Sequence, residues 1–284
     1  MSVWRGVMVA TALPYQGDNV DLERYGEHVK WLLDNGCDGV VPNGSLGEYQ
    51  VLTPAEREAV VRQACEAAPG RVMPGVAAYG ALEARRWAEL AAEAGCPAVM
   101  LLPPNGYRAD DEVVEAHYRE VAKAGLPIVA YNNPYDTKVD LVPEMLARLH
   151  AEGLIVGVKE FSGDVRRAYR LAELAPELDL IVGADDVLVE LRMAGAVGWV
   201  AGFPNAFPRS CVELYHSLDI SLYRTLHPLL RWDSDTLFVQ AIKLSMDLAG
   251  RYGGPCRPPR LPLPDQAAEQ VKAATLKALE SGCR

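Results

Sequence analysis

The chain has 284 residues, half of them hydrophobic, and a formal net charge of −10 at pH 7. Its length is ample for a large core, and an acidic chain without a cluster of Lys and Arg is a poor partner for nucleic acid or an anionic membrane, so we expect a small-molecule ligand. Six cysteines are scattered without any spacing typical of a metal site, which suits a reducing cytosol.

Eight short apolar runs follow one another along the first 202 residues, each with the length and composition of a buried strand. In chain order they cover residues 6–13, 39–44, 72–78, 98–104, 127–132, 155–160, 180–185 and 198–202. Amphipathic stretches separate them. The first stretch has Asp21 as an expected N-cap and ends at Gly36, and the second begins at Thr53, where Glu56 completes an expected capping box.

A strand followed by a helix, repeated eight times, is the pattern of a (β/α)8 TIM barrel. A doubly wound open sheet is the alternative, but the first strand is not followed by a GxGxxG turn. After about residue 222 the strand pattern stops, and helix-like segments follow around the proline-rich residues 255–264. We therefore expect an α/β fold in which residues 1–222 form the barrel with the active site, and residues 223–284 form a small C-terminal helical domain.

Polar residues at the carboxyl ends of the expected strands are the candidates for chemistry, because TIM barrels carry their active sites there. None of the five histidines falls at such a position, so we expect no metal and no other cofactor. The strand ends offer instead an amine, Lys159, a phenol, Tyr131, and a hydroxyl, Ser45.

Lys159 has two interpretations. It could be a solvated residue where a strand meets water, or an unprotonated amine in an apolar barrel mouth that attacks a ketone and forms an imine. The second requires burial to lower the lysine pKa from ~10.4 toward ~7 to 8. Tyr131 could then shuttle protons with Ser45 as its relay, while backbone N–H groups in the turn 44–47 hold a substrate carboxylate.

Three motifs at the ends of the second, fifth and sixth expected strands decide between these interpretations: GSLGE at 44–48, YNNP at 131–134 and GVKE at 157–160. With them, the chain resembles the dihydrodipicolinate synthase / N-acetylneuraminate lyase family of class I Schiff-base lyases over essentially its whole length. The resemblance implies that Lys159 forms the imine, Tyr131 is the acid/base and Ser45 is its relay. It also implies a homotetramer, and further substrate-binding residues at Gly44, Leu46, Gly47 and Val200.

Three positions depart from the pattern of the synthases in that family. Leu46 stands where they usually carry a second hydroxyl residue, and Tyr107 is a single, displaced counterpart of a tyrosine pair that reaches a neighbouring subunit's proton relay. Asp136 stands where they carry the arginine that binds the second substrate's carboxylate. Lys138 and Arg108 are the alternatives for that role, but a lysine does not reproduce a bidentate clamp.

These departures favour a Schiff-base lyase that acts on a pyruvate-like 2-oxo acid through an imine on Lys159. The reaction would be aldol cleavage, dehydration or deamination of a hydroxylated 2-oxo acid or a cyclic imine, with Asp136 accepting hydrogen bonds from the substrate. The first alternative is condensation of pyruvate with aspartate semialdehyde by a 4-hydroxy-tetrahydrodipicolinate synthase. The alternative of another class, a non-catalytic binding or regulatory barrel, is disfavoured by the presence of Lys159 and Tyr131. No signal peptide or membrane span is indicated, so we expect a cytoplasmic protein.

Overall fold

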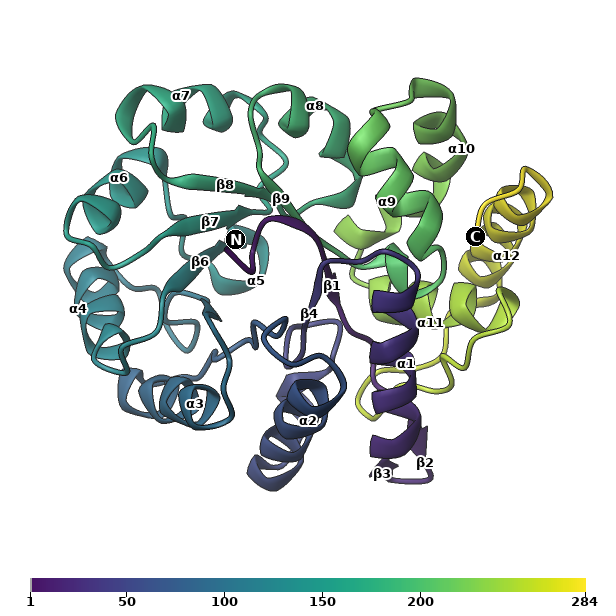
Figure 1. Ribbon diagram of the computed structural model, residues 1–284, viewed down its shortest axis with the longest axis horizontal. Coiled ribbons are helices and arrows are strands. Elements are labelled where there is room, and N and C mark those ends of the chain that lie inside the picture. The colour runs from purple at the N-terminus through teal and green to yellow at the C-terminus, as the bar shows by residue number, and fades with distance from the viewer. Residues whose placement is uncertain (1) are drawn as a thin grey trace.

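Parallel strands form a ring that is surrounded by helices, with further helices on one side of it (Figure 1). The structure is a computed structural model that describes residues 2–284. Its 7-stranded sheet has the order β4-β1-β9-β8-β7-β6-β5, and the neighbouring strands are parallel. In that order the strands span Gly39–Val41, Gly6–Ala10, Gly198–Ala201, Asp179–Val182, Gly157–Glu160, Ile128–Asn132 and Val99–Leu101.

The segment expected as the third strand, residues 72–78, closes the ring without forming a regular ladder. Single bridges join it to both neighbouring strands, as the pairs Val40–Val72 and Gly75–Met100. Pro74 lies between the two bridges and has no N–H to donate, which accounts for the interruption. The backbone N–H of Met100 still donates to Pro74 O at 2.9 Å, so this part of the sheet stays connected and the predicted barrel is confirmed.

Helices cover the outer face of the ring because a parallel sheet must bury both of its faces. Around the barrel they are α1 (Leu22–Asp34), α2 (Pro54–Ala67), α3 (Ala81–Glu93), α4 (Asp111–Ala122), α6 (Pro143–Ala151), α7 (Arg166–Leu174), α8 (Leu188–Met193) and α9 (Pro208–Ser217). Both expected caps are present: Asp21 accepts from Arg24 N at 3.0 Å, and Thr53 and Glu56 form a reciprocal capping box.

Several short elements follow the strands in the chain. They are the hairpin β2 (Tyr15–Gln16) with β3 (Asn19–Val20), the helix α5 (Pro134–Thr137), and the single turns η1 (Tyr49–Val51), η2 (Asp185–Val187) and η3 (Phe203–Asn205). None of the helices formed by residues 2–284 combines the length and the apolar character that crossing a membrane requires.

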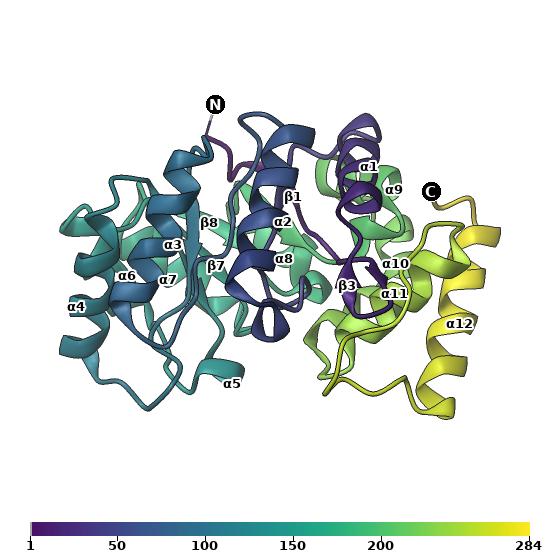
Figure 2. The ribbon, with the colours of Figure 1, turned by 90° about the horizontal axis from the view of Figure 1, so that it is seen from below.

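The C-terminal helices gather at one end of the molecule, as both views show (Figures 1 and 2). This tail comprises α10 (Ile220–Leu230), η4 (Arg231–Ser234), α11 (Phe238–Leu248) and α12 (Asp265–Glu280). Helix α12 packs against α10 and α11, and α11 also contacts η3 at the end of β9. The predicted helical tail is thus present, and a domain boundary between residues 222 and 223 stays a prediction.

A buried ion pair joins the tail to the barrel. The ammonium group of Lys243, on α11, lies 2.8 Å from Glu48 Oε1, and both side chains are almost fully buried. The other carboxylate oxygen of Glu48 accepts from the backbone N–H of Arg257 at 2.9 Å. Lys243 also donates to Pro255 O at 2.8 Å. Because Glu48 directly follows the turn that contains Ser45, these bonds fix that turn relative to the tail.

We expect Lys243→Met to lower the free energy of unfolding by about 3 kcal/mol, since it leaves the carboxylate of Glu48 buried without its cation. Urea unfolding followed by circular dichroism measures the change. The matched control is Lys272→Met on the surface of α12, where the ion pair with Glu269 is exposed and long, 3.8 Å, and where we expect a change within about 0.5 kcal/mol. Equal effects of the two substitutions would contradict a stabilising role for the buried pair.

Candidate active site

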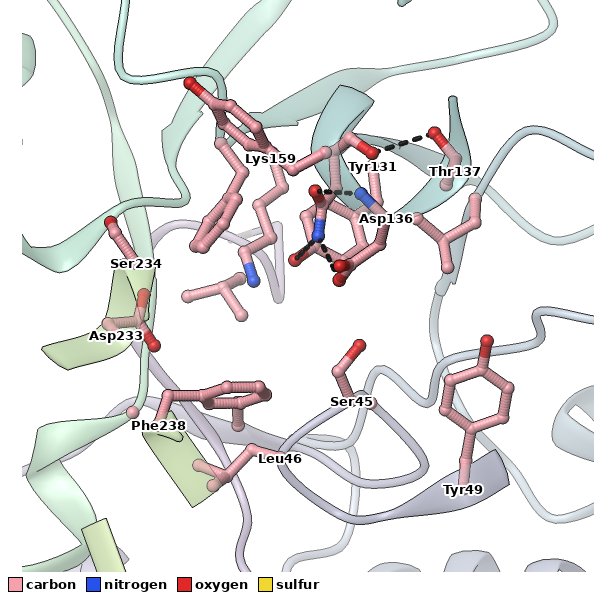
Figure 3. Close-up of a pocket in the computed structure, with 18 of the residues that line it drawn as sticks. Ser45, Leu46, Tyr49, Tyr131, Asp136, Thr137, Lys159, Asp233, Ser234 and Phe238 are labelled. Atoms are coloured by element: carbon pink, nitrogen blue, oxygen red, sulfur yellow. Dashed lines mark hydrogen bonds between the residues drawn. The ribbon is translucent and has the colours of Figure 1, made fainter. Parts of the chain in front are cut away.

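Lys159 and Tyr131 lie side by side at the carboxyl ends of β7 and β6, where they are directly paired in the sheet register. The amine nitrogen of Lys159 is 4.1 Å from the centroid of the Tyr131 ring. Both side chains are buried, with 7% and 5% of their surface exposed. Lys159 is therefore not a solvated residue at a strand edge: its amine points into a cavity (Figure 3).

Burial shifts the pKa values of Lys159 and Tyr131 in opposite directions. It lowers the pKa of the Lys159 amine, although the carboxylates of Asp233, Asp185 and Asp136 act in the opposite sense. It raises the pKa of the Tyr131 phenol, and the nearby charge of Asp233 adds to that rise. The site thus favours an amine that releases its proton more readily than an ordinary lysine, beside a phenol that retains its own.

The cavity has a volume of about 480 Å³, which is within the range of small-molecule sites. The turn after β4 contributes Gly44, Ser45 and Leu46, and the end of β9 contributes Val200. Figure 3 shows Ser45 and Leu46 across the cavity from Asp136. Within the described part of the chain, no three His, Cys, Asp or Glu side chains gather in a way that could hold a metal ion.

The turn 44–47 is tightly packed on the side that faces away from the cavity. A β-carbon added at Gly47 would lie 3.1 Å from Thr11 O, so Gly47 contacts the first strand rather than lining the cavity. A β-carbon at Gly75 would lie only 2.4 Å from Asn43 O, so only glycine lets the third barrel segment pass beneath the turn. These close approaches hold the backbone N–H groups of the turn in place.

Asp136 lines the cavity in the first turn of α5. Its carboxylate accepts from the side-chain amide of Asn133 at 2.9 Å, and the same amide lies 3.3 Å from the hydroxyl oxygen of Tyr131. Asn133 therefore ties the position of Asp136 to that of Tyr131.

The other three predicted residues lie elsewhere. Lys138 has a left-handed backbone conformation, with φ of 60°, and its amine donates to Tyr135 O. Tyr107 and Arg108 are exposed in the loop after β5. Of the described residues that line the cavity, none is Lys138, Tyr107 or Arg108. Neither Lys138 nor Arg108 therefore supplies a positive charge to the part of the cavity wall that contains Asp136.

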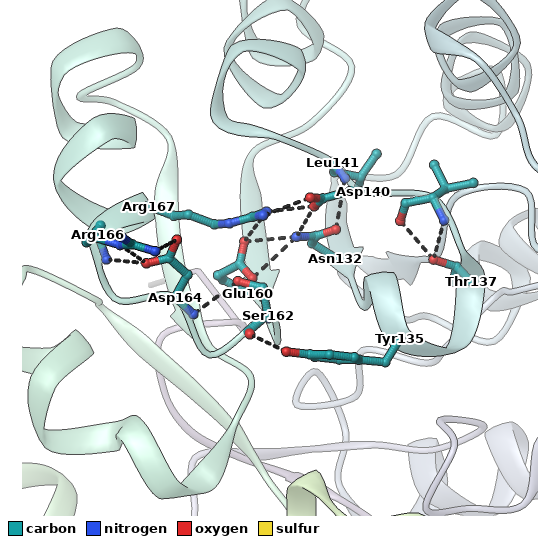
Figure 4. A network of polar contacts seen from close by, with 11 residues as sticks. Asn132, Tyr135, Thr137, Asp140, Leu141, Glu160, Ser162, Asp164, Arg166 and Arg167 are labelled. Carbon is teal, nitrogen blue, oxygen red and sulfur yellow. Dashed lines mark hydrogen bonds and ion pairs between the residues drawn. The ribbon is translucent and has the colours of Figure 1, made fainter.

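A polar network fixes the strand ends that carry the two central residues (Figure 4). The amide of Asn132 donates to Glu160 at 3.0 Å and to Asp140 at 3.3 Å, and Asp140 forms a bidentate ion pair with Arg167. Asn132 and Glu160 directly follow Tyr131 and Lys159 in the chain and are buried. The network therefore holds β6 and β7 in register where the chemistry would occur.

The tail supplies cavity residues that the sequence analysis missed: Asp233, Ser234, Asp235, Thr236, Phe238 and Arg260. Asp233 faces the amine of Lys159 (Figure 3). Burial raises its pKa to about 7, against the lowering effect of Lys159. Gly202 leaves room for these tail side chains, because a β-carbon added at residue 202 would lie 2.6 Å from Ile242 Cδ1 and 3.1 Å from Asp233 Oδ1. The only signal in the sequence was a pair of acidic residues, Asp233 and Asp235, between two apolar helix-like segments.

Comparisons with known proteins agree with this fold. A model of the dihydrodipicolinate synthetase family matches residues 3–279. The 4-hydroxy-tetrahydrodipicolinate synthase of Anaeromyxobacter dehalogenans (strain 2CP-C) is 32% identical over 96% of each chain. The solved 4-hydroxy-tetrahydrodipicolinate synthase of Methylacidiphilum fumariolicum SolV is 28% identical, with a TM-score of 0.92 over 97% of this chain and 96% of that one. A structure described as the first monomeric dihydrodipicolinate synthase variant is 25% identical, with a TM-score of 0.89 over 99% and 98%.

These relatives carry the name of the condensing enzyme, which the sequence left as the first alternative. The broader expectation, an aldolase-type lyase of the Schiff-base class, is confirmed by the family match. Since that match spans all but the two ends of the chain, the protein belongs to the dihydrodipicolinate synthetase family of lyases.

Proposed function

We propose that the protein forms an imine between Lys159 and a pyruvate-like 2-oxo acid and uses it to break or form a bond at the neighbouring carbon. The observation that carries the proposal is a buried lysine amine 4.1 Å from the ring of Tyr131, directed into a cavity of about 480 Å³. An amine in such surroundings is a nucleophile toward ketones when it has lost its proton.

In the proposed mechanism, the uncharged amine of Lys159 attacks the ketone carbon. The ketone oxygen takes one proton from the attacking amine and a second from Tyr131 and leaves as water, so the imine remains with a positive charge. That charge accepts the electron pair released when a bond to the next carbon breaks. Ser45 relays a proton back to Tyr131, while backbone N–H groups of residues 44–46, the part of the turn that lines the cavity, hold the substrate carboxylate. No step requires a metal or another cofactor.

We propose a hydroxylated 2-oxo acid or a cyclic imine as the substrate, with cleavage, dehydration or deamination as the reaction. Asp136 supports this choice, because its carboxylate lies in the cavity wall and accepts hydrogen bonds from hydroxyl or amine groups. The second candidate is condensation of pyruvate with aspartate semialdehyde, which is favoured by the names of the relatives.

Steady-state assays decide between the two candidates. We expect negligible condensation of pyruvate with aspartate semialdehyde if the carboxylate of the semialdehyde has to bind beside Asp136, because two carboxylates ~4 Å apart repel by ~4 kcal/mol at an effective dielectric constant of 20. Some hydroxylated 2-oxo acid or cyclic imine should be turned over under the same conditions. Asp136→Asn removes the negative charge at nearly constant shape and should raise the condensation rate. Efficient condensation by the unaltered protein would contradict our interpretation of Asp136.

The proposed chemistry itself is tested by trapping. Incubation with pyruvate and borohydride should add a stable mass to the peptide that contains Lys159. An adduct on a different lysine, or none with any of a panel of 2-oxo acids, would reject the function.

We further propose a cytoplasmic homotetramer in which Tyr107 reaches the proton relay of a neighbouring subunit. Tyr107 is 58% exposed in this single chain, as a residue that contacts a neighbour would be. Sedimentation equilibrium tests the assembly, which matters because one structural relative is described as a monomeric variant. A monomer with full activity would remove Tyr107 from the mechanism.

A further inference from the structure

Arg260 is a cavity residue whose charge has no hydrogen-bonding or ion-pair partner among the described residues. It lines the cavity from the connector between α11 and α12 and is half-buried. Among residues 2–284, no carboxylate lies within ion-pair distance of its guanidinium group, and that group makes no hydrogen bond. Its nearest aromatic neighbour is Phe238, whose ring centroid is 5.5 Å from the guanidinium carbon. The N–H donors of this guanidinium group are therefore available to an acceptor from outside the chain.

The backbone on both sides of Arg260 is anchored. Three residues upstream, the guanidinium group of Arg257 lies 2.7 Å from Glu56 on α2. The backbone N–H of Arg260 donates to Arg257 O at 3.2 Å and closes a turn. One residue downstream, Leu261 O accepts from the side chain of Gln240 on α11 at 3.0 Å. Arg260 is thus placed at the cavity by bonds to both the barrel and the tail.

The charges around the cavity leave Arg260 as the remaining site for an anion. Among the described residues that line it, the cationic side chains are Lys159 and Arg260. Lys159 would be consumed in the imine, and the carboxylate next to the ketone would be held by the turn after β4. Asp136 and Phe238 lie on opposite walls (Figure 3). Arg260 lies beside Phe238, so an anion bound to it would be on the wall away from Asp136.

We propose that Arg260 binds a carboxylate at the far end of the 2-oxo acid, so that the substrate is a dicarboxylate. The guanidinium fork matches a carboxylate in a bidentate manner. Between the two ends, hydroxyl or amine groups of the substrate would face Asp136. This inference rests on the proposed function, which makes one end of the substrate a 2-oxo acid, and it adds a carboxylate at the other end.

The test compares two ketones with the same five-carbon chain, 2-oxoglutarate and 2-oxopentanoate, which differ only in the distal carboxylate. Half-maximal borohydride trapping by the wild type should need about 10- to 100-fold less 2-oxoglutarate, the usual worth of a hydrogen bond to a charged group. Arg260→Gln should remove this preference and leave the trapping of pyruvate unchanged. The matched control, Arg224→Gln, alters an exposed arginine of α10 outside the cavity and should retain the preference.

A second measurement does not depend on imine formation. Glutarate has two carboxylates and no ketone, and it should raise the Tm of the wild type and of Arg224→Gln but not of Arg260→Gln. Absence of a Tm rise in the wild type, or a preference for 2-oxoglutarate that survives in Arg260→Gln, would overturn the proposal. If pyruvate forms no adduct, the proposed function fails, and the glutarate experiment still decides the role of Arg260.

Discussion

Lys159→Met should abolish both turnover and the borohydride-trapped adduct, because the methionine side chain fills the same space without an amine. Mass spectrometry of the trapped protein and steady-state assays measure the two effects. Lys272→Met, on the exposed surface of α12, should keep both activities at the wild-type level. Residual trapping in Lys159→Met would show that another lysine reacts.

The pH dependence of trapping adds to this test. The nucleophile is the uncharged amine, so the rate of adduct formation should rise with pH and level off near the pKa of Lys159. Because burial lowers that pKa, the plateau should begin below the ordinary lysine value of ~10.4. A rate that still rises at the ordinary value would mean that the nearby carboxylates outweigh burial.

Tyr131→Phe should lower turnover by about 10²- to 10⁴-fold, the usual contribution of general acid–base catalysis. The ring next to Lys159 would remain, so folding and the binding of a 2-oxo acid should survive. Rapid-mixing measurements should locate the loss in proton-transfer steps rather than in KM. Tyr169→Phe removes the hydroxyl of an exposed tyrosine outside the cavity and should be neutral. Near-normal turnover of Tyr131→Phe would reduce Tyr131 to a packing residue.

Local sequence signals were sufficient to predict the barrel. Short apolar runs bounded by polar residues correspond to the strands, and the caps at Asp21 and Thr53 are where the side-chain chemistry requires them. The one irregular strand has an equally local cause, since Pro74 cannot complete a ladder. The pairing of Lys159 with Tyr131 also followed from the sequence, because consecutive parallel strands bring their ends together.

Contacts between the barrel and residues of the C-terminal tail, which are far apart in the sequence, could not be predicted in this way. Asp233 and Arg260 are far from every strand-end motif, and their place in the cavity depends on how the tail packs. The direction of the Lys138 side chain depends on a left-handed helix end that sequence spacing did not reveal. Such positions follow from tertiary contacts, which no local pattern of apolar and polar residues encodes.

The buried pair between Glu48 and Lys243 has a consequence for protein engineering. The position of the turn 44–47 depends on this contact with the tail, so a barrel truncated before α11 would leave the Glu48 carboxylate buried without its cation. Exchanging the tail for that of a relative would succeed only if the lysine were carried along with it. With that contact retained, residues 233–260 become a region in which substrate preference can be redesigned while the strands that carry Lys159 and Tyr131 remain unchanged.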